Sequence, residues 1–124
     1  MERKTRQRDA IRDAFEASGR PLSTQEAHAL AAREVEGLGI ATVYRNIRSL
    51  VEEGWLHTVE LPGEPARYER AGLEHHHHFR CRLCERVFDI EGCPGALKSL
   101  LPRGFRLEGH EVLLYGICPD CARR

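Results

Sequence analysis

Residues 40 to 54 read IATVYRNIRSLVEEG, and this stretch decides how the first half of the chain folds. Its apolar residues recur at helical spacing and share one side of a helix: Ile40, Val43, Ile47, Leu50 and Val51. Tyr44, Arg45 and Arg48 fall on the other faces, and Gly54 is well placed to end the helix in a left-handed conformation. The stretch therefore predicts an amphipathic helix with one face turned to a core.

Two shorter helices are expected before it. Residues 6 to 18, RQRDAIRDAFEAS, carry apolar side chains at helical spacing, and Gly19 and Pro21 then stop the pattern. The run Ser23-Thr24-Gln25-Glu26 has the form of a capping box, in which the Ser23 side chain accepts from the Glu26 amide and Glu26 reaches back. It predicts a second helix that continues to about Arg33.

A hairpin is expected after the third helix, because residues 55 to 61 and 67 to 70 flank the turn Pro62-Gly63-Glu64-Pro65. Three helices and a hairpin make a winged helix-turn-helix, whose third helix enters the major groove of DNA. In that arrangement the DNA bases and phosphates would be contacted by Tyr44, Arg45 and Arg48. The flanking DNA backbone would be contacted by Arg3, Lys4, Arg6 and Arg8. The alternative is three ordinary amphipathic helices with solvated arginines.

Composition limits the class of protein. In 124 residues, Lys plus Arg and Asp plus Glu each number 19, so the net charge neither indicates nor excludes a nucleic-acid partner. No apolar run approaches the roughly 20 residues that span a bilayer, and the N-terminus lacks the apolar segment of a signal peptide. We expect a soluble cytoplasmic protein without a membrane partner.

The second half differs in character. From about Leu73, short alternating or apolar runs at 86 to 90 and 112 to 117 surround a helix-like piece from Pro94 to Leu101. The predicted fold class is thus α/β of the α+β type, with a winged-helix domain over residues 1–72 and a small α/β domain over residues 73–124. Domains this small usually need a metal or a partner to supplement thin cores.

Four of the five cysteines form two Cys-x-x-Cys pairs, Cys81 with Cys84 and Cys118 with Cys121. Two such turns in one short chain suit a closed tetrahedral zinc site, in which the metal is structural. Redox dithiols or chance spacing are the alternatives. Cys93 is left as a spare thiol.

His75 to His78 form an unbroken run before the first pair. If the run is extended, His75 and His77 face one way and His76 and His78 the other, so that one run serves two metal sites. An expression tag is a poor explanation because the run is internal. A catalytic zinc needs an open coordination position and a placed general base, and no His-Glu-x-x-His motif is present.

Together these features resemble the ferric uptake regulator (Fur) family of metal-dependent transcriptional repressors. The motifs that carry the resemblance are Thr5 to Arg8, Ala41-Thr42-Val43-Tyr44-Arg45, His75 to His78, both cysteine pairs, and Gly104-Phe105-Arg106-Leu107 through His110 to Leu114-Tyr115-Gly116. The resemblance implies an N-terminal DNA-binding domain and a C-terminal dimerization domain. It also implies a homodimer that binds a palindromic operator when loaded with metal, with Thr42, Tyr44 and Arg45 in the recognition helix.

The resemblance also implies ligands for two further sites. For a regulatory site it adds Glu69, His57 and Asp89 to His76 and His78; Arg20 stands where iron- and peroxide-sensing members carry a histidine. For an additional site, His75 and His77 would be joined by His110 and by Cys93, which matches a family glutamate. Three imidazoles and one thiolate suit zinc better than iron(II) or manganese(II).

These inferences predict a zinc-sensing repressor, with structural zinc in the cysteine site and zinc or another divalent transition metal in the regulatory site. Within the family, the alternatives are an iron, manganese, nickel or peroxide sensor. Outside it, they are a zinc-stabilised adaptor or a small metallohydrolase.

Overall fold

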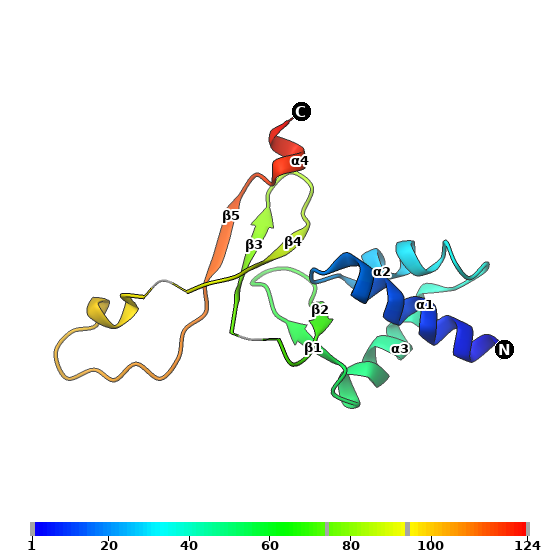
Figure 1. The fold of residues 1–124 in the computed structure, drawn as a ribbon, viewed down its shortest axis with the longest axis horizontal. Coiled ribbons are helices and arrows are strands. Elements are labelled where there is room, and N and C mark those ends of the chain that lie inside the picture. Colours follow the sequence, from blue (N-terminus) through cyan, green and yellow to red (C-terminus); the bar gives the residue numbers. More distant parts are fainter. Residues whose placement is uncertain (1, 74, 94, 124) are drawn as a thin grey trace. The chain divides into compact units, whose positions relative to one another are not determined.

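The computed structural model describes residues 2–73, 75–93 and 95–123, which form two compact units, Met1–Leu73 and Glu74–Arg124 (Figure 1). Each unit is described by itself. In the described part of the chain, no helix is both long enough and apolar enough to cross a membrane. The architecture is α+β, with three helices and a hairpin in the first unit and a small sheet in the second.

The first unit contains helices α1 (Arg3–Ser18), α2 (Thr24–Ala31) and α3 (Ile40–Glu52). The predicted capping box is confirmed: the Ser23 hydroxyl accepts from the Glu26 amide at 3.1 Å, and Glu26 Oε1 accepts from the Ser23 amide at 3.0 Å. Past the end of α3, Gly54 has a φ of +80°, as predicted. The amides of Gly54 and Trp55 bond the carbonyls of Val51 and Leu50, which is a Schellman ending.

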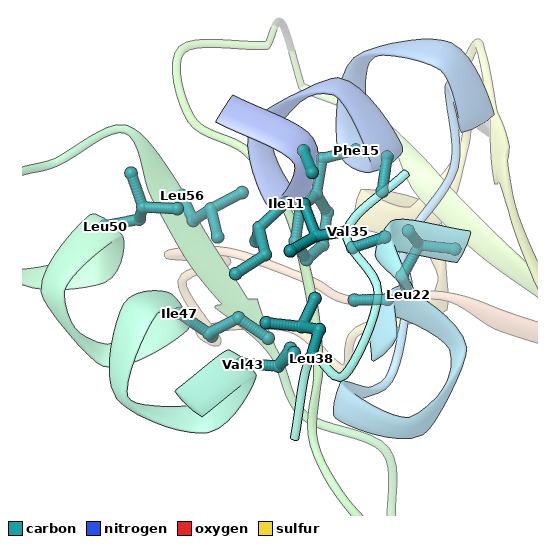
Figure 2. Close-up of a cluster of buried hydrophobic side chains, with 13 residues drawn as sticks. Ile11, Phe15, Leu22, Val35, Leu38, Val43, Ile47, Leu50 and Leu56 are labelled. Carbon is teal, nitrogen blue, oxygen red and sulfur yellow. The ribbon is translucent and has the colours of Figure 1, made fainter. Parts of the chain in front are cut away.

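A cluster of thirteen buried hydrophobic residues holds α1, α2, α3 and the first hairpin strand together (Figure 2). Val43, Ile47 and Leu50 of α3 are fully buried in it, as their spacing predicts. Ile40 is a correction, because its side chain is 45% exposed instead of joining the core face. Ile40 is the first residue of α3 and lies at the edge of the core. The buried residues Val43, Ile47 and Leu50 lie farther along the helix.

The hairpin consists of antiparallel strands β1 (Leu56–Val59) and β2 (Arg67–Arg70). Backbone bonds between Leu22 and Tyr68 tie β2 to the connection between α1 and α2. The three helices and this anchored hairpin form the winged helix-turn-helix that the sequence predicts.

The second unit is a sheet of three strands in the order β4-β3-β5, made of β3 (His77–Cys81), β4 (Val87–Ile90) and β5 (Leu113–Gly116). β4 pairs antiparallel with β3 and β5 pairs parallel with it. The chain ends in a short helix, α4 (Pro119–Ala122).

The helix expected between β4 and β5 is not found among its described residues, 95 to 101. These contain the 3-10 turn η1 (Leu97–Leu100) in its place, and Pro94 lies outside the described residues. No side chain caps the N-terminus of η1 and none of its residues is buried, so neither capping nor burial extends the turn into an α-helix.

Candidate metal centres and nucleic-acid interface

The four paired cysteines meet at one end of the second unit. Cys81 is the last residue of β3 and Cys84 lies in the turn that follows. The parallel pairing sets Gly116 of β5 opposite Cys81, which brings the start of α4, with Cys118 and Cys121, beside the first turn. The fold thus joins two pairs that are far apart in the sequence.

The sulfur positions suit a tetrahedral ion. All four Sγ atoms lie within 4.8 Å of one another, and those of Cys84 and Cys118 are 3.8 Å apart. Zinc–thiolate bonds of about 2.3 Å give a tetrahedron with edges of about 3.8 Å. Cys81, Cys118 and Cys121 are buried, so the cluster is closed to solvent as a structural site requires.

The surroundings of the thiols shift their pKa values in different directions. Amide groups, that of Cys84 foremost, donate toward Cys81 Sγ and lower the pKa of this thiol to about 5. Burial raises the pKa of Cys121 to about 12. Since a metal binds thiolates, capture of a cation by this cluster releases protons from the cysteines that are still thiols.

Arg86 borders this cluster and was not among the site residues expected from the sequence. Its Nε donates to Cys84 Sγ at 3.2 Å and its Nη2 lies 3.9 Å from Cys118 Sγ. Burial raises the pKa of Cys84, but the hydrogen bond from Arg86 and other local donors outweigh it and leave that pKa below its usual value. A basic residue two positions after a ligand cysteine was the only signal in the sequence.

A second cluster contains His75, His77, Cys93 and His110, whose ligand atoms lie within 4.8 Å of one another. His77 opens β3, Cys93 follows β4, and His110 precedes β5, so the sheet topology brings them together. The strand begins only at His77, yet His75 and His77 still share a side, as the alternation predicts.

The imidazoles of this cluster converge on one point. Nε2 of His75 is 3.1 Å from that of His77 and 3.3 Å from that of His110, and the last two are 3.2 Å apart. A neutral imidazole nitrogen bears one proton or one lone pair, so three in a closed triangle cannot all hydrogen-bond one another. A cation among them satisfies all three, and zinc–nitrogen bonds of about 2.0–2.1 Å give separations of about 3.3–3.4 Å.

The remaining groups of the cluster also fit a metal. Cys93 Sγ lies 2.8 Å from His110 Nε2, which supplies a thiolate beside the three imidazoles. Burial, followed by the neighbouring His75, lowers the pKa of His77 and favours the neutral imidazole that ligates metals. His77 is buried and Cys93 is exposed, so this cluster opens to solvent on one side.

The third group of ligands lies on the other side of the histidine run. Asp89 of β4 is the cross-strand partner of His78, and its Oδ1 lies 3.3 Å from Nε2 of both His76 and His78. The two imidazole centroids are 4.9 Å apart. Two imidazoles and a carboxylate make half or more of a coordination sphere for a divalent transition metal.

In the first unit, His57 and Glu69 are also cross-strand partners, on β1 and β2. His57 Nε2 lies 2.7 Å from Glu69 Oε1. The hairpin thus presents an imidazole and a carboxylate together, which is the pair that the sequence analysis assigned to the regulatory site. Whether they share an ion with Asp89 and the histidines stays a prediction.

The surface of α3 that does not face the core is polar and basic. Tyr44 is 48% exposed, Arg45 and Arg48 are exposed, and the Arg45 guanidinium donates to the Thr42 hydroxyl at 3.2 Å. A hollow of about 490 Å³ is bordered by Tyr44 and Arg45, by the start of α2 and by the hairpin. Exposed polar and basic groups are what the predicted DNA-reading role of α3 needs, and their contact with DNA stays a prediction.

Arg6 and Arg8, two of the α1 residues expected to contact the DNA backbone, differ in their surroundings. Arg6 is exposed, whereas both carboxylate oxygens of Glu53 accept from Arg8 Nη2 at 2.6 Å. This hydrogen bond lowers the pKa of Glu53. Arg8 therefore joins α1 to the end of α3, and contact with a phosphate would have to compete with Glu53.

Comparisons with known proteins found similar sequences and similar folds. The model of the ferric uptake regulator family matches residues 2–115. The chain is 33% identical over 122 residues to the zinc uptake regulation protein of Mycobacterium tuberculosis, covering 96% of this chain and 94% of that protein. A solved structure described as a zinc-bound manganese uptake regulator superposes with a TM-score of 0.77 at 26% identity, covering 90% of this chain and 87% of that one.

Other relatives are matched over part of their length. The ferric uptake regulation protein of Campylobacter jejuni is 34% identical over 87 residues, covering 68% of this chain and 55% of that protein. The chain thus spans little more than half the length of some curated relatives that it matches.

Proposed function

The chain belongs to the ferric uptake regulator family, and we propose that it is a metal-responsive transcriptional regulator that binds operator DNA. The observation that carries this proposal is the presence, in one small chain, of several convergent groups of metal ligands and a winged helix-turn-helix with an exposed basic α3. The four-cysteine cluster is by itself the closed kind of site that stabilises a small domain. The further groups of imidazoles and carboxylates support a second role for metal, in which its binding regulates the protein.

We assign the residues 1–72 to DNA binding and the residues 73–124 to dimerization and metal binding. In the first domain, the residues that meet DNA are Arg6, Arg8, Thr42, Tyr44, Arg45 and Arg48. Exposed apolar side chains of the second unit, Leu114 and Tyr115 of β5 among them, support pairing with a second copy. A twofold dimer binds a palindromic operator because each copy reads one half-site.

The regulatory site in this proposal uses His76, His78 and Asp89 of the second domain, completed by Glu69 and His57 of the hairpin. A metal held by ligands from both domains restricts the angle between them, and it favours one arrangement of the two DNA-reading helices in the dimer. Metal binding and operator binding then strengthen each other, and the loaded dimer represses. The bound ion supplies only charge and fixed coordination geometry in this step.

Zinc is the metal that the donor atoms favour. Cys93 adds a thiolate to three imidazoles in the additional cluster, and this soft, tetrahedral set suits zinc better than iron(II) or manganese(II). Arg20, whose guanidinium pairs with Glu26 at 3.0 Å, cannot ligate a metal and so adds nothing to a six-coordinate iron site. Iron, manganese, nickel or peroxide sensing within the same family is the second candidate.

An enzymatic role is excluded by the family, whose members are transcriptional regulators and not enzymes. The metallohydrolase considered on sequence grounds is therefore set aside.

The test is fluorescence anisotropy of the full chain on a duplex that the zinc-loaded protein has itself selected from a random library. We expect zinc to raise the affinity of the wild type and to have little effect on the His76→Ala variant. The matched comparison is Cys93→Ser, which lies outside the regulatory site and should keep most of the response. Native mass spectrometry should find the cysteine-bound zinc in all three proteins.

Two results would overturn the proposal. One is a wild-type affinity for the selected duplex that no metal changes. The other is a His76→Ala variant that responds to zinc as the wild type does, because the regulatory ligands would then lie elsewhere.

A further inference from the structure

Arg86 connects the two cysteine turns. It lies two residues after Cys84, directly before β4, and its Nε–H bonds the Sγ of that cysteine. The other end of the guanidinium reaches the C-terminal turn, where Nη2 lies 3.9 Å from Cys118 Sγ and donates to Asp120 Oδ2 at 3.3 Å. A single side chain thus contacts a ligand from each Cys-x-x-Cys pair.

The position of Arg86 is fixed by its neighbours. Its carbonyl accepts from the Cys81 amide at 3.0 Å, and the guanidinium lies 5.7 Å from the Phe88 ring centroid. Asp120 is itself held, because its Oδ1 accepts from Arg123 at 3.4 Å. The Arg86 side chain is partly shielded, with 31% of its surface exposed.

The Arg86 guanidinium lies close enough to the cysteine sulfurs to offset their negative charge when they bind a metal. Four thiolates around a divalent cation carry a net charge of about −2, and burying such a charge is unfavourable unless it is compensated. A guanidinium bonded to one sulfur and close to another supplies a compensating charge, with directional N–H donors. Hydrogen bonds to ligand atoms orient them and tune the metal that they hold.

We propose that Arg86 is a positioning residue for the Cys81, Cys84, Cys118 and Cys121 zinc site. Arg86 holds the two cysteine turns together and offsets the negative charge of their thiolates. As a result the zinc ion stays bound and serves as a structural ion. Asp120 orients the guanidinium toward the sulfurs. This inference rests on the assignment of the four cysteines to zinc and does not depend on operator binding.

Arg82 offers a matched control in the same turn. It lies between Cys81 and Cys84, its side chain is exposed, and its amide bonds the Gly116 carbonyl through the backbone alone. Arg82→Gln therefore removes a positive charge next to the same ligands without removing a bond to sulfur.

The experiment measures zinc release from the zinc-loaded full chain into an excess of a colorimetric chelator at neutral pH under reducing conditions. We expect Arg86→Gln to release its cysteine-bound zinc roughly 10- to 100-fold faster than the wild type, the range found for partners that bond metal ligands. Arg82→Gln should stay within about twofold of the wild type. Arg86→Lys should recover only part of the loss, because an ammonium lacks the planar fork that spans both turns.

A second readout separates this role from general destabilisation. In the cobalt(II)-substituted protein, loss of the N–H···S bond should move the sulfur-to-cobalt charge-transfer band of Arg86→Gln to lower energy and leave that of Arg82→Gln in place. Fluorescence of Trp55, the single tryptophan, checks that the first unit stays folded.

Several results would overturn the inference. Equal zinc-release rates for Arg86→Gln and Arg82→Gln would show that Arg86 has no role at the zinc site. An unshifted sulfur-to-cobalt charge-transfer band in Arg86→Gln would show the same. Full recovery by Arg86→Lys would contradict the positioning role. A wild-type protein that holds no zinc would contradict the assignment of the four cysteines to a zinc site. This outcome is distinguishable from a failure of operator binding, because the experiment uses no DNA.

Discussion

Removal of the cysteine-bound zinc should unfold the second unit and leave the first one folded. The change is made in two ways, by a strong chelator on the wild type and by Cys118→Ser, which deletes one ligand. Cys93→Ser is the matched control, because it alters a cysteine of the same unit outside this cluster.

The magnitude follows from what each unit buries. Among the described residues, the first unit has thirteen buried hydrophobic side chains in one cluster, whereas the cluster at the end of the second consists of Cys81, Cys118 and Cys121 with partly buried neighbours. Structural zinc contributes about 10–16 kcal/mol in comparable small sites. Domains are stable by only about 0.05–0.15 kcal/mol per residue, which is about 3–8 kcal/mol for a unit the length of Glu74–Arg124, so a loss of about 10–16 kcal/mol exceeds the stability of the second unit.

The assay is amide hydrogen exchange read by mass spectrometry. After zinc removal, β3, β4 and β5 should exchange at the rate of an unfolded chain, and α3 should keep its protection. The unfolding midpoint reported by Trp55 should shift by no more than a few degrees. Protection of β3 that survives both chelation and Cys118→Ser would refute this reasoning, as would simultaneous loss of protection in α3.

Three further predictions concern single residues. Arg45→Ala should weaken operator binding by about 1–3 kcal/mol, the cost of a lost base contact. The control is Arg33→Ala, which changes an exposed arginine outside α3 and should leave the affinity unchanged. Equal anisotropy curves for the two variants would contradict the assignment of Arg45 to DNA binding. Cys93→Ser should weaken zinc binding at the additional cluster, measured by competition with a fluorescent zinc chelator. Because Cys93 is proposed as a ligand, the loss of affinity should exceed the roughly 10- to 100-fold that is typical when a residue hydrogen-bonded to a ligand is lost. Unchanged affinity would show that Cys93 is not a ligand. The Arg8 hydrogen bond lowers the pKa of Glu53 below its usual 4.5, so its stabilisation is present above that pH and is lost as the pH falls through the lowered value. Glu53→Gln should therefore lower the stability of the first unit slightly at pH 7, with the difference from wild type shrinking below pH 4.5; a difference independent of pH would exclude the ion pair as its source.

Local signals in the sequence predicted the first unit well. The capping box at Ser23 and the left-handed Gly54 are each determined by a few adjacent residues, and the structure confirms both. Alternation along a strand likewise separates the neighbours His77 and His78 onto two sides without knowledge of the rest of the fold.

Features set by distant residues could not be predicted in this way. The parallel pairing of β5 with β3 depends on the whole connection between them, and it is what brings Cys118 to Cys81. The contacts of Arg86 with Cys118 and Asp120 depend on that same pairing. Ile40 was misplaced for a related reason: helical spacing gives the face of a residue, but not where along the helix the core ends.

One titration tests whether metal occupancy controls DNA binding. The affinity of the full chain for its selected duplex is measured by anisotropy across buffered concentrations of free zinc, with manganese, nickel and iron(II) in parallel. We expect zinc to tighten binding by roughly 5- to 150-fold, a coupling of about 1–3 kcal/mol, and to do so at a lower free concentration than the other metals. An affinity that is the same at every free zinc concentration, with the cysteine-bound zinc in place throughout, would contradict this expectation.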